Sequence, residues 1–315
     1  MYHVVMSPKT HVVERGLAGM QTRATSLVMS VFGDVVAPHG GVLGLGSLIR
    51  WLEPFGVNER AVRTAVHRLT TSGWIERTSA GRRTDCRITP QSRHRFSEAD
   101  RRIYASGSPV WNGEWSVLFL GHGGMSTKAR DRARRELRWH GFGELAPNVL
   151  VHPFADLEEL ELALGELGIE RSTVVLRARR DERLPSNGRP LDELAAMAWD
   201  FRDLTREYRA FLRRFETIAL QLRPLPSPEI CFRVRVLVIH EYRRILLRDP
   251  ELPAELLPPE WVGGEARRLC AGIYWHVATA ATAFVAETGS TSGGALPAAA
   301  AGFYGRFGGS PDGAD

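Results

Sequence analysis

The sequence predicts an α+β protein of several domains: an N-terminal winged helix-turn-helix, a central ferredoxin-like α/β domain and a C-terminal α-helical domain. Three observations support this prediction. Residues 22–106 hold helical segments followed by a short β-ribbon, residues 107–182 alternate strands with helices, and residues 191–288 carry apolar side chains at helical spacing. A chain of 315 residues is long enough for two or three domains with cores of their own.

The composition describes a basic protein with few cysteines. The net charge of +5 and the pI of about 9.4 favour an anionic partner. Cys86, Cys231 and Cys270 are far apart and form no CxxC pair, which is typical of a reducing compartment. The start of the chain lacks the apolar stretch of a secretory signal, and no run of about 18 apolar residues could span a bilayer. We therefore expect a cytoplasmic protein that does not associate with a membrane.

Two helices are predicted after a flexible arm at residues 1–21. The segment "TSLVMSVFGDVVAPHG" predicts the first, with Ser26 as its cap and Pro38 at its end. The segment "GSLIRWLEPFG" predicts the second, with Ser47 as its cap. Apolar residues recur on one side of both segments, as they do in helices that pack against a core.

A third helix is predicted from its N-cap Asn58 to its stop at Gly73. Its apolar face carries Ala61, Val62, Ala65, Val66 and Leu69, and its polar face carries Arg60, Arg63, Thr64, His67 and Thr71. The following "GWIERTSAGRRTDCRIT" predicts two strands around a turn at Ala80–Gly81. The order of helix, helix, turn, helix and ribbon is that of a winged helix-turn-helix.

Positive charge is concentrated in this part of the chain. Residues 58–102 contain eleven arginines and five acidic residues, so the remainder of the chain is close to neutral. A helix with a packed inner face and a basic outer face can enter the major groove, while a basic ribbon lies on the backbone or in the minor groove. We therefore predict DNA binding by Asn58, Arg60, Arg63, Thr64, His67, Arg68, Arg82 and Arg83. The alternative is a solvated helix beside a solvated hairpin.

The rest of the chain divides into a mixed region and a helical one. After a helix begun by Thr89 and Pro90, the strands "WSVLFL", "NVLVHP" and "STVVLRA" alternate with helices, which predicts the ferredoxin-like domain at 107–182. The segment "RLPSNGRP" at 183–190 predicts a linker. Long helices then fill residues 191–288. The Gly-, Ala- and Ser-rich residues 289–315 are predicted to be disordered.

Segments in all three regions resemble the PaaX family. They are "FGVNERAVRTAVHRL" in the first, "RELRWHGFGELAPNVLVHP" in the second and "VLVIHEYRRILLRDPELPAELLP" in the third. The resemblance extends over about residues 26–275. It implies a repressor of phenylacetate-degradation genes that binds operator DNA as a homodimer. It also implies release from that DNA by an aryl-CoA thioester such as phenylacetyl-CoA.

The homodimer and the effector each have some support in the residues. One DNA-reading helix per chain covers too few base pairs for useful specificity, so two-fold symmetry is expected to supply a second. Aromatic rings and arginines of the C-terminal region offer a place for the effector, because arginine binds phosphate well. The candidate effector residues are Trp199, Arg206, Tyr208, Arg209, His240, Tyr242, Arg243 and Arg244. His240 by itself fits a hydrogen-bonded interface residue better than a ligand residue.

Two other functions are alternatives. A metal nuclease on the ferredoxin-like domain needs carboxylates for Mg²⁺, whereas "FLGHGG" after the first strand has His122 and no aspartate. The ten histidines show neither HExxH nor zinc-ligand spacing, so we expect no enzymatic activity, no metal and no cofactor. A winged helix used for protein contacts would expose apolar anchors instead of arginines. Salt dependence of DNA binding separates that possibility from a DNA-binding module.

Overall fold

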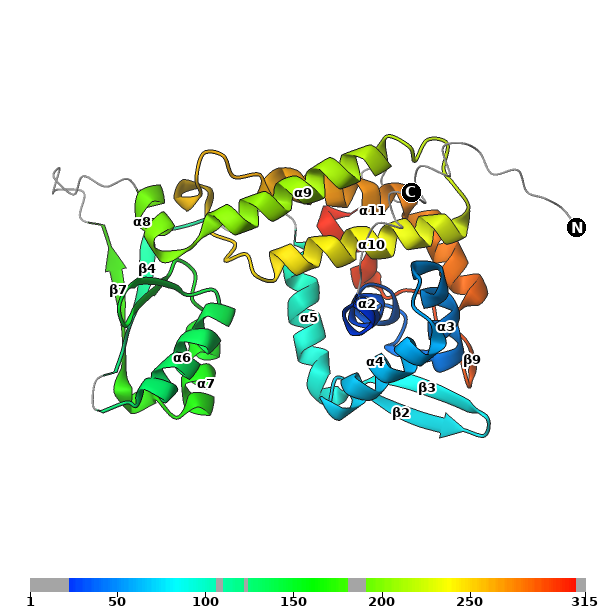
Figure 1. The fold of residues 1–315 in the computed structure, drawn as a ribbon, viewed down its shortest axis with the longest axis horizontal. Coiled ribbons are helices and arrows are strands. Elements are labelled where there is room, and N and C mark those ends of the chain that lie inside the picture. The colour runs from blue at the N-terminus through cyan, green and yellow to red at the C-terminus, as the bar shows by residue number, and fades with distance from the viewer. Residues whose placement is uncertain (1–22, 106–109, 122–123, 181–190, 310–315) are drawn as a thin grey trace, which may run out of the picture. The chain divides into compact units, whose positions relative to one another are not determined.

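The computed structural model describes residues 23–105, 110–121, 124–180 and 191–309, and Figure 1 traces their helices and strands. The chain forms two compact units. The first takes its residues from 1–106, 209–244 and 264–315, and the second from 107–208 and 245–263. One boundary between the units falls between residues 106 and 107, and residues 191–288 contribute to both units.

Three helices and a small sheet form the N-terminal part of the first unit. The helices are α2 (Ala24–Val31), which continues as a π-helical turn, α3 (Leu45–Leu52) and α4 (Glu59–Thr71). The strands β1 (Val42–Gly44), β2 (Ile75–Ala80) and β3 (Arg83–Ile88) pair antiparallel in the order β1-β3-β2. Strand β1, which has only three residues, is absent from the elements that the sequence predicts. Helix α5 (Pro90–Tyr104) follows, capped as predicted by the side chain of Thr89.

The predicted caps Ser26 and Ser47 are wrong. The N-cap residues of α2 and α3 are Arg23 and Gly44, three positions earlier in each case, and neither helix has a side-chain hydrogen bond at its N-cap. The hydroxyl of Ser26 instead accepts a hydrogen bond from Arg243 at 3.1 Å. The hydroxyl of Ser47 lies 3.1 Å from that of Ser290. Both serines are therefore used for contacts with distant parts of the chain.

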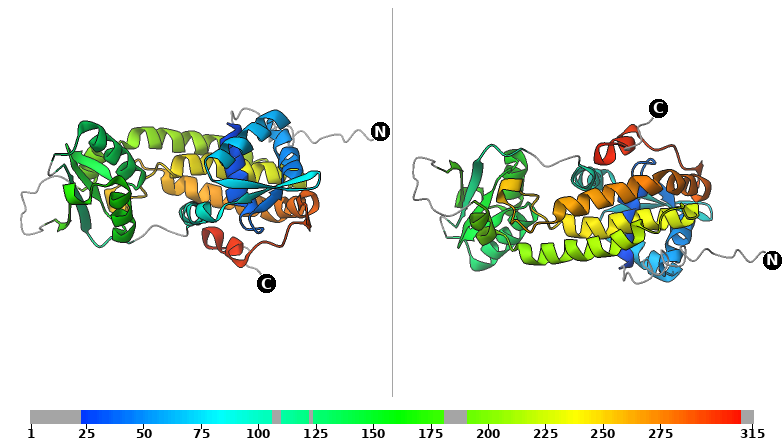
Figure 2. Two further views of the ribbon diagram at one scale, coloured as in Figure 1. Left: turned by 90° about the horizontal axis from the view of Figure 1, so that it is seen from below. Right: turned by 90° about the horizontal axis from the view of Figure 1, so that it is seen from above.

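Long helices complete the first unit. They are the part of α9 (Phe201–Ala219) after Tyr208, most of α10 (Pro228–Leu246) and most of α11 (Gly263–Thr288), and Figure 2 shows them side by side. By length and composition α11 could cross a membrane, with a mean hydropathy of 1.4 over 18 residues, although its sequence has no continuous apolar run. Tyr274, Val277 and Ala281 of α11 are completely buried in the unit. A core helix of this kind passes the same test, so the feature is weak evidence for a membrane span.

The central region has the predicted ferredoxin-like fold. Its elements are β4 (Glu114–Leu120), α6 (Thr127–Trp139), β5 (Gly143–Ala146), β6 (Val149–His152), α7 (Leu157–Leu167) and β7 (Thr173–Arg179). The four strands are antiparallel in the order β5-β6-β4-β7, which is the strand order of a split βαβ unit. Strand β5, which begins directly after the turn that follows α6, was missed by the sequence prediction.

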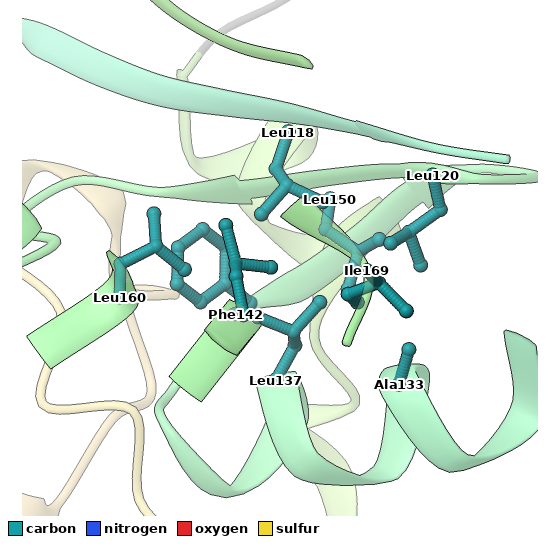
Figure 3. Close-up of a cluster of buried hydrophobic side chains, with 9 residues drawn as sticks. Leu118, Leu120, Ala133, Leu137, Phe142, Leu150, Leu160 and Ile169 are labelled. Carbon is teal, nitrogen blue, oxygen red and sulfur yellow. The ribbon is translucent and has the colours of Figure 1, made fainter. Parts of the chain in front are cut away.

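Each face of this sheet has its own core. One face packs against α6 and α7, and Figure 3 shows the cluster that fills it: Leu118, Leu120, Ala133, Leu137, Phe142, Leu150, Leu160, Leu164 and Ile169. On the other face, Trp115 and Val151 pack with α8 (Leu191–Ala198), the start of α9 and residues 252–256. Alternate residues of β4 serve the two faces, because successive side chains of a strand point in opposite directions.

The C-terminal segment is ordered, so the prediction of disorder is wrong for residues 289–309. It forms β8 (Ser290–Thr291), β9 (Gly294–Ala295) and a 3₁₀-helical stretch, Ala301–Gly308. A Cβ on Gly44 would lie 2.7 Å from the carbonyl oxygen of Ser290, so the approach of the segment to β1 requires glycine. The segment is held by contacts with residues that are distant in the sequence, and local composition cannot predict such contacts. Residues 310–315, the predicted arm at 1–21 and the predicted linker at 183–190 lie outside the described residues.

A buried charged cluster joins this segment to the N-terminal helices. The carboxylate of Asp34 accepts hydrogen bonds from Arg235 Nε at 2.9 Å and from Arg306 Nη1 at 3.0 Å. The hydroxyls of Tyr104 and Tyr274 donate to the same carboxylate at 2.8 and 3.1 Å. We call these five residues, with Asp100, the Asp34 cluster.

The charges of the Asp34 cluster are balanced. The guanidinium of Arg306 also pairs with Asp100, so two carboxylates face two guanidinium groups. Burial by itself would raise the pKa of Asp34, but Arg235 and Arg306 outweigh burial and hold that pKa below its ordinary value. Asp34 therefore remains ionised in the core, where an unpaired charge would be strongly destabilising.

Candidate nucleic-acid interface

Helix α4 has the two faces that the sequence predicts. Asn58 caps it by accepting a hydrogen bond from the amide of Ala61 at 2.9 Å. The inner face is buried and packs against α2, α3 and β2; its buried residues are Val62, Ala65, Val66 and Leu69. The outer face is exposed, and its exposed residues are Arg60, Arg63, Thr64, His67 and Arg68. The packing of the inner face thus fixes the helix in place, while the basic side chains of the outer face remain accessible to solvent.

The outer face divides into paired and unpaired arginines. The guanidinium of Arg63 lies 2.6 Å from the carboxylate of Glu59, one turn earlier on α4. Within the described part of the chain, Arg60 and Arg68 have no such carboxylate partner. A surface pair of this kind is worth only about 0.3–0.5 kcal/mol, so Arg63 can exchange its partner easily.

The β2–β3 hairpin extends beside this helix with exposed arginines at its tip. Its turn has Gly81 at φ +59°, followed by Arg82 in the turn and Arg83 at the start of β3. The middle of strand β3 is held in two ways. Strand β1 pairs with β3, and the carboxylate of Asp85 accepts hydrogen bonds from the amide and hydroxyl of Ser292 at 2.9 and 2.5 Å. The C-terminal segment therefore supports the hairpin.

A hollow of about 890 Å³ lies between α4 and the first turn of α2. From α2 and its N-cap it is lined by Arg23, Ala24, Thr25, Ser26 and Met29; from α4 and its N-cap by Asn58, Arg60, Ala61, Thr64, Ala65 and Arg68; and from α10 by Arg243. No acidic residue is among the described residues that line it. Sequence reasoning missed Arg23, because a residue before a predicted helix carries no periodic signal.

Arg243 and His240 attach α10 to α2 at the base of this hollow. Nε of Arg243 donates to the hydroxyl of Ser30 at 2.7 Å, and Nη2 donates to the carbonyl oxygen of Ser26 at 2.7 Å. Nδ1 of His240 lies 2.8 Å from the same Ser30 hydroxyl. Burial, followed by the nearby Arg243 and Arg244, lowers the pKa of His240 to about 3. His240 is thus a buried residue that is hydrogen-bonded to α2.

The eight candidate effector residues are divided between the two units. Trp199, Arg206 and Tyr208 belong to the second unit, and the other five belong to the first. Tyr208 is buried and donates its hydroxyl to Asp249 at 2.7 Å, whereas Arg206 pairs with Asp203 on the surface. In the first unit, Tyr242 is buried against Phe211, Arg209 is exposed, and Arg244 pairs with Glu241. Of the eight, only Arg243 lines the hollow described above.

Reactive groups are few in the part of the chain that the structure describes. No cluster of three or more His, Cys, Asp or Glu side chains there could hold a metal ion. The three cysteines are buried and unpaired, and burial raises the pKa of Cys86 and of Cys231 to about 11. His122, which occupies the position of interest for a nuclease, lies outside the described residues.

Comparison with known proteins gives matches along most of the chain. Three family descriptions match: PaaX-like protein at residues 23–91, PaaX protein central Cas2-like domain at 108–189, and PaaX-like protein C-terminal domain at 199–287. The transcriptional repressor PaaX of Escherichia coli (strain K12) is 35% identical over 307 residues, which cover 96% of each chain. Among solved structures, the uncharacterized protein Rv0674 from Mycobacterium tuberculosis is similar with a TM-score of 0.53 and 25% identity, over 82% of this chain and 97% of that one.

Proposed function

The chain belongs to the PaaX family of transcriptional repressors, and we propose that it represses transcription by binding operator DNA through an N-terminal winged helix-turn-helix. In this proposal α2, α3 and α4 are the three helices, α4 is the recognition helix, and the β2–β3 hairpin is the wing. A repressor role agrees with the absence of enzymatic activity that we expect from the sequence.

The observation that carries the proposal is the outer face of α4. Its arginines are accessible, and Arg60 and Arg68 have no carboxylate partner within the described residues. Exposed guanidinium groups without counter-charges on a rigid helix favour contact with phosphates and guanine edges. A helix that served only as a solvated surface would be expected to mix its charges as α6 does, where Arg134 pairs with Asp131 and Glu144.

We assign different roles to the helix and the wing. Arg63 and His67, one turn apart on α4, are proposed to approach base edges in the major groove, with Asn58, Arg60, Thr64 and Arg68 beside them. Arg82 and Arg83 at the tip of the hairpin are proposed to contact the backbone or the minor groove. The Asp85–Ser292 contact keeps the wing in place relative to α4, since both belong to the first unit.

The family further supports a homodimer, an aryl-CoA effector and a cytoplasmic location. Two recognition helices related by two-fold symmetry match an inverted-repeat operator. Phenylacetyl-CoA is the effector that we propose, acting on genes of aromatic-acid degradation. It must bind the DNA-free state more tightly than the DNA-bound state, because a ligand with equal affinity for both shifts nothing.

The test is binding of the full-length protein to its own upstream DNA, with and without phenylacetyl-CoA. We expect a complex whose affinity falls steeply with salt and that dissociates on addition of the thioester. Coenzyme A and free phenylacetate, the two halves of the thioester, are the matched controls and should leave the complex intact. An affinity that does not depend on the salt concentration would contradict a DNA-contacting role for the arginines. A complex that persists with every aryl-CoA tested would contradict the proposed effector.

A further inference from the structure

The hollow beside α4 concentrates positive charge, and no acidic residue is among the described residues that line it. Arg23, Arg60, Arg68 and Arg243 all line it, and none of them has a carboxylate partner among the described residues. Arginines elsewhere in the chain are commonly paired, as Arg177 is with Glu114 at 2.8 Å. Four guanidinium groups around one space repel each other unless an anion enters between them. As the described residues form it, the hollow therefore has the electrostatic character of an anion site.

Arg243 is fixed in an orientation suited to such a role. Two of its three guanidinium nitrogens are used by Ser30 and Ser26, so the side chain is held against α2. The third, Nη1, has no hydrogen-bond partner within the described ranges of the chain and is not enclosed in the core. Burial lowers the pKa of Arg243 to about 10, which still leaves it cationic at neutral pH. A fixed cation with a free donor binds an anion at little cost in side-chain entropy.

The neighbouring groups match a phosphate better than a carboxylate. Thr25, Ser26 and Thr64 add hydroxyls to the four guanidinium groups, which provides many donors around one space. A phosphodiester has several acceptor oxygens and a full negative charge, and arginine is well shaped to bind it. The hollow also borders the exposed face of α4, along which a DNA strand passes when a recognition helix enters the major groove.

We propose that the hollow binds backbone phosphate of the operator strand beside α4, and that Arg243 of α10 and Arg23 before α2 are DNA phosphate contacts. This inference rests on the proposed DNA-binding function and extends it to a helix outside the winged helix-turn-helix. It assigns Arg243 to DNA instead of to the effector. Because Arg243 is bonded to the first turn of α2, the contact also anchors α10 to the DNA-bound arrangement of the N-terminal helices.

The test compares Arg243→Gln with Arg244→Gln in the full-length protein. Arg244 is adjacent on α10 but is paired with Glu241 and does not line the hollow, which makes it the matched control. Binding to the upstream fragment and to random DNA of equal length is measured by fluorescence anisotropy across a salt series. Loss of one phosphate contact should weaken both complexes by roughly fivefold at 0.15 M salt and lower the salt slope by about one. Arg244→Gln should change neither quantity.

Arg23→Gln guards against a purely structural effect. The side chain of Arg23 is exposed and has no hydrogen bond or ion pair within the described chain, so its loss should leave the melting temperature unchanged while it weakens both DNA complexes. Wild-type affinity in Arg23→Gln and Arg243→Gln, with the wild-type protein binding its operator, would overturn this inference alone. Absence of operator binding by the wild-type protein would overturn the proposed function as well. Unchanged DNA binding with loss of phenylacetyl-CoA binding in Arg243→Gln would assign the hollow to a small phosphorylated ligand instead.

Discussion

Two groups of arginines in the first unit are placed in opposite environments. Arg235 and Arg306 lie in the core, where Asp34 and Asp100 neutralise them. Arg60 and Arg68, in contrast, lie on the exposed flank of α4 and have no carboxylate partner among the described residues. The same residue type therefore serves two purposes. Where a guanidinium is buried and paired, its loss costs stability; where it is accessible and unpaired, its loss should cost binding.

The largest expected effect comes from breaking the buried group. Asp34→Asn leaves Arg235 and Arg306 in the core with one carboxylate fewer, and we expect the free energy of unfolding to fall by about 3–5 kcal/mol. Chemical denaturation followed by circular dichroism measures it. The control is Asp203→Asn, which removes an exposed carboxylate paired with Arg206 at 2.9 Å and should cost at most about 1 kcal/mol. Equal losses in the two variants would show that burial does not distinguish the pairs.

A smaller loss is expected at the C-terminal end of the same cluster. Arg306→Met keeps the length of the side chain but removes its bonds to Asp34 and Asp100, while Arg235 still compensates Asp34. We expect a loss of about 2–3 kcal/mol in unfolding free energy and faster hydrogen exchange at residues 289–308. Fast exchange of that segment already in the wild-type protein would contradict its role as a packed part of the first unit.

These tests concern features that the sequence could not supply. The faces of α4 were predictable, because the required pattern lies within fourteen residues and depends only on helical periodicity. Asp34 gave no signal, since a single acid in an apolar helical segment is usually expected to face solvent. The caps Ser26 and Ser47 were mispredicted because their partners, Arg243 and Ser290, lie more than 200 residues away.

Composition misled at the C-terminal end. Residues 289–309 are rich in glycine and alanine, which favours disorder, yet Phe303 and Arg306 are buried and hold the segment in place. The basic outer face and the hairpin tip of the candidate site followed from charge and period. The hollow did not, because Arg23, Ser26 and Arg243 come together only in the folded unit.

On the exposed side, the helix and the wing should respond differently to substitution. Arg63→Ala should reduce the difference in binding free energy between operator and random DNA by about 1–3 kcal/mol, because a bidentate arginine–guanine contact discriminates bases. Arg82→Ala should weaken both complexes alike and lower the salt slope by about one. Affinities on both DNAs across a salt series separate these outcomes. The reverse pattern would mean that the wing discriminates between bases and that α4 contacts the DNA backbone.

The buried His240 shares the Ser30 hydroxyl with Arg243, and its titration should affect the stability of the fold. Its folded pKa of about 3 lies below its ordinary value of 6.5, so it stays neutral in the fold while the unfolded chain takes up a proton. Its contribution to stability is therefore complete above pH 6.5 and is lost as the pH falls toward 3, by up to about 1.4 kcal/mol per pH unit. His240→Gln should flatten this slope in denaturation curves between about pH 4 and 6. Exposed His67→Gln is the control, and an unchanged slope in His240→Gln would place the proton uptake elsewhere.

The most direct test of the contrast is a double variant of the unpaired arginines, Arg60→Gln with Arg68→Gln, measured for both stability and DNA binding. We predict that its melting temperature equals that of the wild-type protein, while the salt slope of binding to random DNA falls by about two. Two phosphate contacts would then have been removed without harm to the fold. A salt slope equal to that of the wild-type protein, or a loss of stability as large as that of Asp34→Asn, would contradict the assignment of these arginines to DNA.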